Sequence, residues 1–191
     1  MNAVAAVVLA AGASSRLGEL KQLACLGEEK LLERAVRVAR EAGCSPVIVV
    51  LGSKYIQVLE NSLLGDAVSV VNDEWETGMS SSVRLGVRTL RSMGEHAEGV
   101  LLMTCDQPAV TAGHLRLLMK GVEMKASRYA ERNGVPAFFP KQYFAKLMML
   151  KGDAGARELL ATSPYEELAG GELDVDTVED LARARKLFAS R

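Results

Sequence analysis

Apolar runs rich in β-branched residues alternate with segments of helical periodicity, and this alternation restricts the possible folds more than any other feature of the chain. The runs predict buried strands over residues 4–10, 46–51, 68–71 and 99–105. The segments between and after them predict helices over residues 31–42, 53–64, 79–92 and 111–124. Such a pattern is typical of a parallel sheet with helices on both faces. The sequence therefore predicts an α/β protein with three layers (α/β/α) and a mostly parallel, Rossmann-like sheet.

Shorter elements are expected after residue 124. Asn133-Gly134 is a strong turn signal between two strands, and Gly43 and Thr111 are expected to cap helices. The expected elements are strands at 127–131, 136–139 and 172–175, and helices at 140–149, 154–162 and 178–189. A length of 191 residues is typical of one domain.

The composition excludes several classes of protein. A formal net charge of −1 provides no long-range field for nucleic acid or an anionic membrane, so any bound anion must be held by local groups. Cys25, Cys44 and Cys105 show no C-x-x-C spacing, which favours reduced thiols over structural zinc. No cation precedes the apolar stretch 3–11, and no apolar run approaches the ~20 residues of a membrane span. A cytoplasmic protein is expected, without nucleic-acid or membrane partners.

A loop of small residues follows the first strand and contains two fixed cations. Glycine and alanine let backbone N–H groups approach a bulky anion, and Arg16 and Lys21 supply positive charge. The loop is not a Walker A motif, because Glu19 stands where that motif needs lysine. A tight turn is the plainer alternative, but the two cations favour a binding loop for a nucleoside triphosphate.

Carboxylates follow two of the expected strands. Asp106 ends the run at 99–105, and Asp176 follows the run at 172–175. Because ligands of open α/β sheets bind at the carboxyl ends of the strands, both side chains should lie beside the cation-bearing loop. Mg²⁺ is commonly held by one or two carboxylates together with substrate phosphates. The alternatives are a turn-forming Asp106 before Pro108 and an N-cap role for Asp176.

Three serines open the helix expected at 79–92. Ser80, Ser81 and Ser82 follow Gly78-Met79 and would offer hydroxyls, free N–H groups and the positive end of the helix dipole to an anion. A single serine would only cap the helix, whereas three favour substrate binding. Charged residues further along this helix, Arg84 and Arg88, are expected to be solvated.

Several motifs resemble known families. The loop Leu9-Ala10-Ala11-Gly12-x-Ser14-x-Arg16-x-Gly18-x-x-Lys21 resembles the signature loop of nucleotidyltransferases with the nucleotide-diphospho-sugar transferase fold. The remaining motifs resemble the molybdenum cofactor cytidylyltransferase branch: Asn72-x-x-Trp75-x-x-Gly78-Met79-Ser80-Ser81-Ser82, Cys105-Asp106-Gln107-Pro108, Gly152-Asp153-x-Gly155-Ala156-Arg157 and Asp174-x-Asp176-Thr177-x-Glu179-Asp180. The resemblance covers essentially the whole chain.

This resemblance implies transfer of CMP from CTP to the terminal phosphate of molybdenum-bound molybdopterin, with Mg²⁺ as cofactor and pyrophosphate as product. Arg16, Lys21 and Asp106 are then catalytic, and Asp106 and Asp176 bind the metal. The nucleotide-binding residues are Leu9, Ala10, Ala11, Gly12, Ser14, Arg16 and Lys21. The substrate-binding residues are Gly78, Met79, Ser80, Ser81, Ser82, Gly152, Asp153 and Arg157. Residues 1–110 form the nucleotide-binding half and residues 111–191 the acceptor-binding half of one domain.

The chain departs from the family pattern at Lys30 and Val178, where proline is usual. Ala11 stands where guanylyl-transferring relatives have glycine, which favours CTP over GTP because an added methyl narrows the pocket. The alternatives are a sugar- or polyol-phosphate nucleotidyltransferase, a molybdopterin guanylyltransferase that uses GTP, and a non-catalytic chaperone that delivers molybdenum cofactor. A monomer that meets a molybdoenzyme or chaperone transiently is expected.

Overall fold

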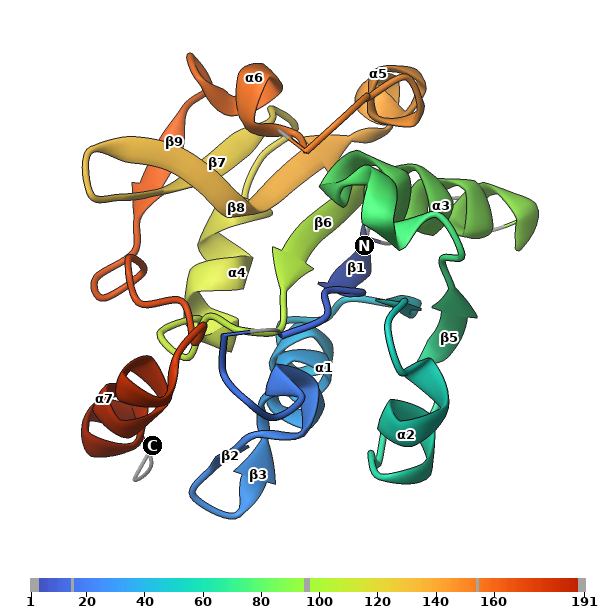
Figure 1. Ribbon diagram of the computed structural model, residues 1–191. Coiled ribbons are helices and arrows are strands. Elements are labelled where there is room, and N and C mark those ends of the chain that lie inside the picture. Colours follow the sequence, from blue (N-terminus) through green and yellow to red (C-terminus); the bar gives the residue numbers. More distant parts are fainter. Residues whose placement is uncertain (1–3, 15, 95–96, 154, 189–191) are drawn as a thin grey trace.

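The computed structural model describes residues 4–14, 16–94, 97–153 and 155–188. Seven strands form one sheet in the order β5-β4-β1-β6-β8-β7-β9 (Figure 1). All are parallel except β8, which pairs antiparallel with both β6 and β7. The strands are β1 (Val4–Ala10), β4 (Val47–Leu51), β5 (Val68–Val71), β6 (Gly99–Thr104), β7 (Lys125–Tyr129), β8 (Arg132–Pro140) and β9 (Tyr165–Glu167). The expectation of a mostly parallel sheet is confirmed.

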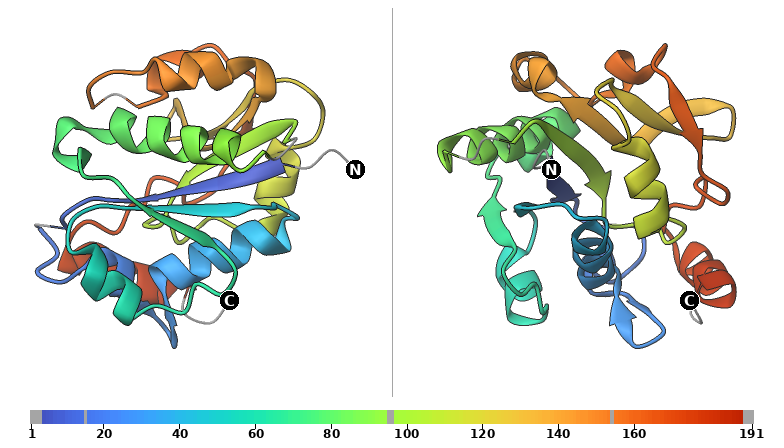
Figure 2. Two further views of the ribbon diagram at one scale, coloured as in Figure 1. Left: turned by 90° about the vertical axis from the view of Figure 1, so that its right-hand side faces the viewer. Right: turned by 180° about the vertical axis from the view of Figure 1, so that it is seen from behind.

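Helices cover both faces of the sheet (Figure 2). One face carries α3 (Met79–Ser92), α5 (Phe144–Met148) and α6 (Arg157–Leu160), and the other carries α1 (Leu31–Glu41), α2 (Tyr55–Glu60) and α4 (Ala112–Leu118). Residues of β1 alternate between the two cores: Ala6 and Val8 pack on the α1 side, and Ala5 and Val7 on the α3 side. A strand buried on both faces explains the uninterrupted apolar run in the sequence.

A third, smaller core joins the C-terminal helix to the segment after the first loop. Helix α7 (Val178–Phe188) packs on the short hairpin of β2 (Cys25–Leu26) and β3 (Glu29–Lys30), which the sequence analysis missed. Leu173 and Val175 belong to this core, so the chain before α7 is fixed beside the end of β6. This packing brings residues 174–176 to the edge of the sheet.

Two expectations about the second half of the chain were wrong. The turn between β7 and β8 lies at Ala130 and Glu131, which have φ angles of 46° and 60°, and not at Asn133-Gly134. Asn133 and Gly134 lie within the long β8, where they pair with Arg128 and Ser127 of β7, and this pairing overrides the local turn signal. Residues 172–175 form no strand, because the edge of β7 is taken by β9 instead.

Several helices are shorter than expected. Helix α2 begins after Lys54, which has a left-handed φ of 52°, and ends at Glu60, before Asn61, whose side chain donates to the Gln57 carbonyl. Helix α4 ends at Leu118 but starts as expected, with the Thr111 hydroxyl accepting from the His114 N–H. No helix in the described part of the chain is long and apolar enough to cross a membrane.

Candidate active site

Two cations and two carboxylates meet at the carboxyl-terminal edge of the sheet. Lys21 Nζ lies 2.8 Å from Asp106 Oδ2 and 2.6 Å from Asp176 Oδ1. Arg16 Nη2 lies 2.7 Å from Asp176 Oδ2. Asp106 lies two residues beyond the end of β6, and the Val175 N–H donates to its carbonyl at 2.9 Å, which holds Asp176 beside it. The structure thus joins residues that are separated by up to 160 positions in the sequence.

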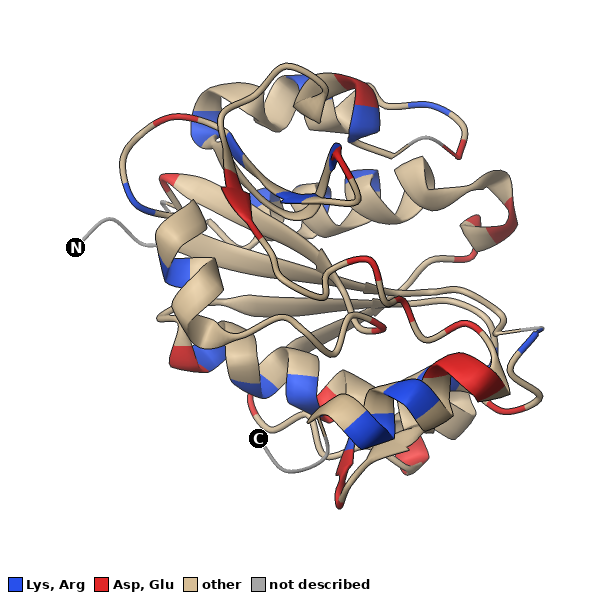
Figure 3. Cartoon of the chain, turned by 90° about the vertical axis from the view of Figure 1, so that its left-hand side faces the viewer, with Lys and Arg blue, Asp and Glu red and all other residues tan. Residues whose placement is uncertain are grey.

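The electrostatics of this cluster shift the pKa values of Lys21 and Asp176 in the direction that favours their charged forms. Burial alone would lower the pKa of the Lys21 ammonium, but Asp106 and then Asp176 outweigh it and raise that pKa. Burial would also raise the pKa of Asp176, but Lys21 and then Arg16 lower it. Burial, followed by the charge of Asp106, raises the pKa of neighbouring Asp174 to about 6. The pKa shifts of Lys21 and Asp176 thus come from neighbouring side chains within the cluster. The helices on the side shown in Figure 3 carry both positively and negatively charged residues.

The loop after β1 is cross-linked from inside by Gln22. This side chain is fully buried, and its Nε2 donates to the carbonyls of Ala10 at 2.7 Å and Gly12 at 3.0 Å. The Ser14 hydroxyl accepts from the Lys21 N–H at 3.0 Å and donates to Gln22 Oε1 at 3.4 Å. Ser14 and Gln22 thus fix the backbone that carries Lys21. Sequence reasoning missed Gln22, although a polar residue within Leu20-Lys21-Gln22-Leu23-Ala24 was a usable signal.

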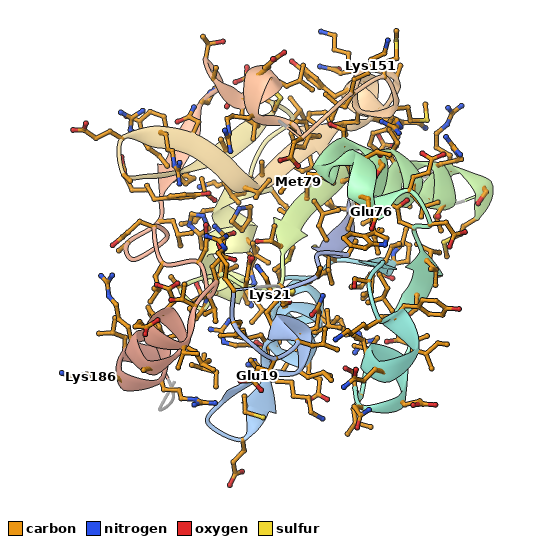
Figure 4. The ribbon with its side chains drawn as sticks, viewed as in Figure 1. Glu19, Lys21, Glu76, Met79, Lys151 and Lys186 are labelled. Atoms are coloured by element: carbon orange, nitrogen blue, oxygen red, sulfur yellow. The ribbon has the colours of Figure 1, made fainter. Side chains whose placement is uncertain are left out.

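A cavity of about 500 Å³ opens on this loop. Its size falls within the usual range for small-molecule sites. It is lined on one side by the predicted nucleotide-binding residues Leu9, Ala10, Ala11, Gly12 and Lys21. The other walls are Gln22, Trp75, Glu76, Thr77, Gly78, Met79, Ser82, Thr104, Cys105, Asp106 and Asp153. In Figure 4, Lys21 lies below Met79, the first residue of α3, and Glu76, which lies just before that helix.

A second cavity of about 290 Å³ meets the first at the charged cluster, because Lys21, Met79, Thr104 and Asp106 line both. Its remaining walls come mainly from the second half of the chain: Gln107, Tyr129, Arg132, Asn133, Gly134, Val135, Ala156, Arg157, Leu160, Asp174 and Asp176. Arg157 was expected here, whereas Tyr129, Arg132 and Asn133 were not. They were missed because they flank the hairpin turn that the sequence analysis misplaced.

The serines at the start of α3 differ from expectation. The Asn72 side-chain amide donates to the hydroxyls of Ser81 at 2.8 Å and Ser82 at 2.9 Å, and the Ser81 hydroxyl donates to the Gly78 carbonyl. Ser80 is fully buried, and its hydroxyl has no hydrogen-bond partner within the described part of the chain. Ser82 lines the first cavity. The three hydroxyls therefore do not form one exposed set, and the Ser81 hydroxyl fixes the loop before α3.

The N–H groups at the start of α3, expected to be free, are also partnered. The Met79 N–H donates to Asp153 Oδ1 and the Ser80 N–H donates to the Gly152 carbonyl, both at 3.2 Å. Residues 152–153 thus dock on the helix and place Asp153 at the cavity wall. Arg84 is not a solvated charge either, because its guanidinium donates to the Leu150 carbonyl at 2.7 Å. These contacts hold the segment before α6 against α3.

The chemistry of the charged cluster suits a divalent cation. Asp106 and Asp176 already hold one cationic nitrogen between them at hydrogen-bond distance. Within residues 4–14, 16–94, 97–153 and 155–188, no group of three or more His, Cys, Asp or Glu could hold a metal ion. Two carboxylates alone are a typical protein contribution to Mg²⁺ when substrate phosphates complete the coordination. The residues therefore fit a metal that binds together with a phosphorylated ligand.

A mostly parallel sheet with a small-residue loop, two cations and paired carboxylates at its carboxyl edge is an arrangement suited to a phosphorylated ligand and a divalent cation. The family model described as "MobA-like NTP transferase domain" matches residues 6–169. The chain belongs to this family, and it is a nucleotidyltransferase.

Relatives in this family carry several different names. The chain is 30% identical to the purine catabolism protein PucB of Bacillus subtilis (strain 168), with 96% of each chain covered. It is 31% identical to the nicotine blue oxidoreductase of Paenarthrobacter nicotinovorans, with 94% of this chain and 95% of that one covered. The molybdenum cofactor cytidylyltransferase of Escherichia coli (strain K12) is 22% identical over 98% of both chains. The family is therefore established, whereas the identities leave the nucleotide and the acceptor open.

Solved structures show the same fold. Rv0371c from Mycobacterium tuberculosis H37Rv is 34% identical and superposes with a TM-score of 0.82, covering 97% of this chain and all of that one. A complex of Rv0371c with manganese aligns at 31% identity with a TM-score of 0.78, covering 97% and 99% of the two chains. A nucleotidyl transferase from Methanothermobacter thermautotroptrophicus, 23% identical, has a TM-score of 0.82 over 100% and 99%.

Proposed function

We propose that the protein transfers CMP from CTP to the terminal phosphate of molybdopterin, which carries molybdenum, and releases pyrophosphate. The observation that carries this proposal is the meeting of two cavities at Lys21 and Asp106. A transferase must hold a donor and an acceptor on opposite sides of the reacting phosphorus, and two joined cavities provide that arrangement. The first, on the side of residues 1–110, would take the nucleotide. The second, largely from residues 111–191, would take the acceptor.

The reaction needs positioning and charge neutralisation more than covalent chemistry. The acceptor phosphate would attack the α-phosphorus of CTP in line with the leaving pyrophosphate. An ionised phosphate is already a nucleophile, so no protein base is required. Cys105 lines the nucleotide cavity but is not a nucleophile, because burial and then the charge of Asp106 raise the pKa of its thiol to about 12. The donor and acceptor would therefore react directly.

The charged cluster would neutralise the triphosphate. Mg²⁺ bound to Asp106 and Asp176 would supply a Lewis acid for the α- and β-phosphates. Lys21 and Arg16 would counter the charge that develops on pyrophosphate, and the backbone at Ala11 and Gly12 would cradle the phosphates. On the acceptor side, Arg132 and Arg157 line the cavity and would attract an anionic substrate.

Ala11 supports cytosine as the base. Its methyl lies opposite Gly52, where an added Cβ would be only 2.8 Å from Ala11 Cβ and 2.8 Å from Trp75 Cβ. The Ser53 N–H also donates to the Ala11 carbonyl at 3.1 Å, so the loop cannot shift freely away from this contact. Ala11 also lines the first cavity, where alanine leaves less room than glycine would, and a smaller space would suit a pyrimidine better than a purine.

A panel of four nucleoside triphosphates against molybdopterin and sugar 1-phosphates tests the proposal. Pyrophosphate release and the mass of the product would be recorded for each pair, with each nucleotide alone as control. CTP with molybdopterin should give the highest kcat/KM and a product heavier by one CMP. Turnover with a sugar 1-phosphate and none with molybdopterin would replace the acceptor. A kcat/KM that favours GTP would replace the base, and binding without pyrophosphate release would indicate a delivery chaperone.

A further inference from the structure

The Lys21 ammonium is bonded to the same two carboxylates that the proposed metal requires. Its Nζ lies 2.8 Å from Asp106 Oδ2 and 2.6 Å from Asp176 Oδ1, and it is the side chain that bridges the pair. Arg16 reaches Asp176 from outside, with 70% of its side chain exposed. A divalent cation that coordinates these carboxylates would lie beside the Lys21 ammonium and be repelled by it. Tight metal binding therefore requires the ammonium to move away.

We propose that Lys21 competes with the divalent cation for Asp106 and Asp176, so that the metal binds strongly only together with a triphosphate. This inference rests on the metal–triphosphate site of the proposed function. Lys21 would hold the carboxylates until a nucleotide offers its ammonium another anion. The carboxylates then become free for the metal. Nucleotide and metal would each raise the affinity of the other by the same factor, as linkage requires.

The charges explain why neither metal binding alone nor displacement of Lys21 alone is favourable. Asp106 and Asp176 carry two negative charges, and Lys21 and Arg16 carry two positive ones, so the cluster is neutral as it stands. A divalent metal added alone would leave excess positive charge in a partly buried site. Displacement of Lys21 alone would leave Asp106, whose side chain is only 16% exposed, without its cationic partner, and would leave Asp176 with Arg16 alone, which is costly beside Asp174. Simultaneous arrival of triphosphate and metal satisfies every group.

The geometry allows this exchange without movement of the backbone. The Lys21 N–H is held by the Ser14 hydroxyl at 3.0 Å, and Gln22 fixes the loop through the carbonyls of Ala10 and Gly12. The flexible four-carbon stem can still turn, because Lys21 lines the nucleotide cavity as well as the acceptor cavity. Only the ammonium has to move from the carboxylates towards the phosphates.

Binding of Mn²⁺ in the absence of nucleotide tests the inference, with free Mn²⁺ measured by electron paramagnetic resonance. Lys21→Met and Lys21→Gln should bind Mn²⁺ about tenfold to a hundredfold more tightly than the wild type, the range usual for coupled sites. Lys125→Met is the matched control: Lys125 is about as buried as Lys21 and pairs with Glu166 at 2.9 Å, away from both cavities, so the affinity of this variant should stay near that of the wild type. In Lys21→Met, adding Asp106→Asn should abolish the gain, which locates the ion.

Equal Mn²⁺ affinity in the wild type and both Lys21 variants would overturn the inference, as would a gain that survives Asp106→Asn. A thermal melt of each variant in EDTA shows whether it is folded, and Lys21→Gln serves if Lys21→Met is not. The titrations contain no acceptor and no CTP. A failure of the proposed function appears instead as absent pyrophosphate release from the wild-type enzyme with molybdopterin.

Discussion

Gly78 should be the glycine at which substitution most damages the site. It has a φ of +108°, and an added Cβ would lie 2.8 Å from both the carbonyl carbon and the oxygen of Gly152 and 2.9 Å from Asp153 Cα. All three atoms belong to the backbone, so no side chain can rotate away. Gly43 has a similar φ of +95°, but a Cβ there would meet nothing within 4 Å. Gly43→Ala is therefore a matched control that carries only the conformational strain.

The two variants should differ by a predictable amount. Both substitutions place alanine at a positive φ, which costs roughly 1–2 kcal/mol. Relief of the clash at Gly78 also separates residues 152–153 from α3 and removes the hydrogen bonds of the Met79 and Ser80 N–H groups, each worth about 0.5–1.5 kcal/mol. Gly78→Ala should thus lower the free energy of unfolding by roughly 2–5 kcal/mol, and Gly43→Ala by roughly 1–2 kcal/mol.

Denaturant unfolding measures these differences, and fluorescence of Trp75 measures nucleotide binding to the cavity. Trp75 is the single tryptophan of the chain and lines the first cavity, the one proposed to take the nucleotide. Gly78→Ala should weaken nucleotide binding at least about tenfold, because Gly78, Met79 and Asp153 form part of the cavity wall. Gly43→Ala should leave binding unchanged. Equal losses of stability in the two variants, with equal nucleotide affinities, would refute this reasoning.

Three further predictions concern the charged cluster and the base. Lys21→Ala should reduce turnover by about a hundredfold or more, as expected for the loss of one charge-stabilising group. Mn²⁺ should raise the Tm of this variant more than it raises the Tm of the wild type. Turnover equal to that of the wild type would make Lys21 structural. Asp174→Asn should increase the free energy of unfolding of the metal-free protein at pH 7 by about 1 kcal/mol, a value already reduced for the partial exposure of the side chain. The reason is that burial raises the pKa of Asp174 to about 6 and so disfavours its ionised form. This gain should shrink as the pH falls from about 6 towards the ordinary value of 3.8, and a gain independent of pH would contradict it. The wild type should prefer CTP to GTP by about 10- to 100-fold in kcat/KM, and Ala11→Gly should reduce this preference. An unchanged ratio would mean that other residues select the base.

Much of the first half of the fold could be predicted because its signals are local. The bounds of β5 and α3 agree with expectation, and Thr111 caps α4 as its residue type indicates. The β7–β8 turn could not be placed, because Ala130 and Glu131 adopt positive φ angles that neither residue signals. The length of β8 follows from its pairing with β7 and, at its end, with β6, and these pairings are tertiary contacts.

The candidate site shows the same division. The approach of Lys21, Asp106 and Asp176 agrees with the rule that ligand-binding groups gather at the carboxyl ends of parallel strands. Asp176 nevertheless does not lie at the end of a strand as expected, since residues 172–175 form no strand. Gln22 acts through the loop carbonyls that it reaches in three dimensions. A contact of this kind, between a side chain and loop carbonyls, cannot be predicted from the spacing of residues in the sequence.

Pyrophosphate release from CTP and molybdopterin by Asp106→Asn, with Mg²⁺ present, tests most directly whether the charged cluster is the catalytic centre. The variant should lose about a hundredfold or more of the wild-type rate, corresponding to ~3 kcal/mol of transition-state stabilisation, while it remains folded. Asp66→Asn is the control, because Asp66 is 91% exposed and pairs with Arg40 away from both cavities. Its rate should equal that of the wild type. A wild-type rate in Asp106→Asn would contradict the assignment of Asp106 and of the site built around it.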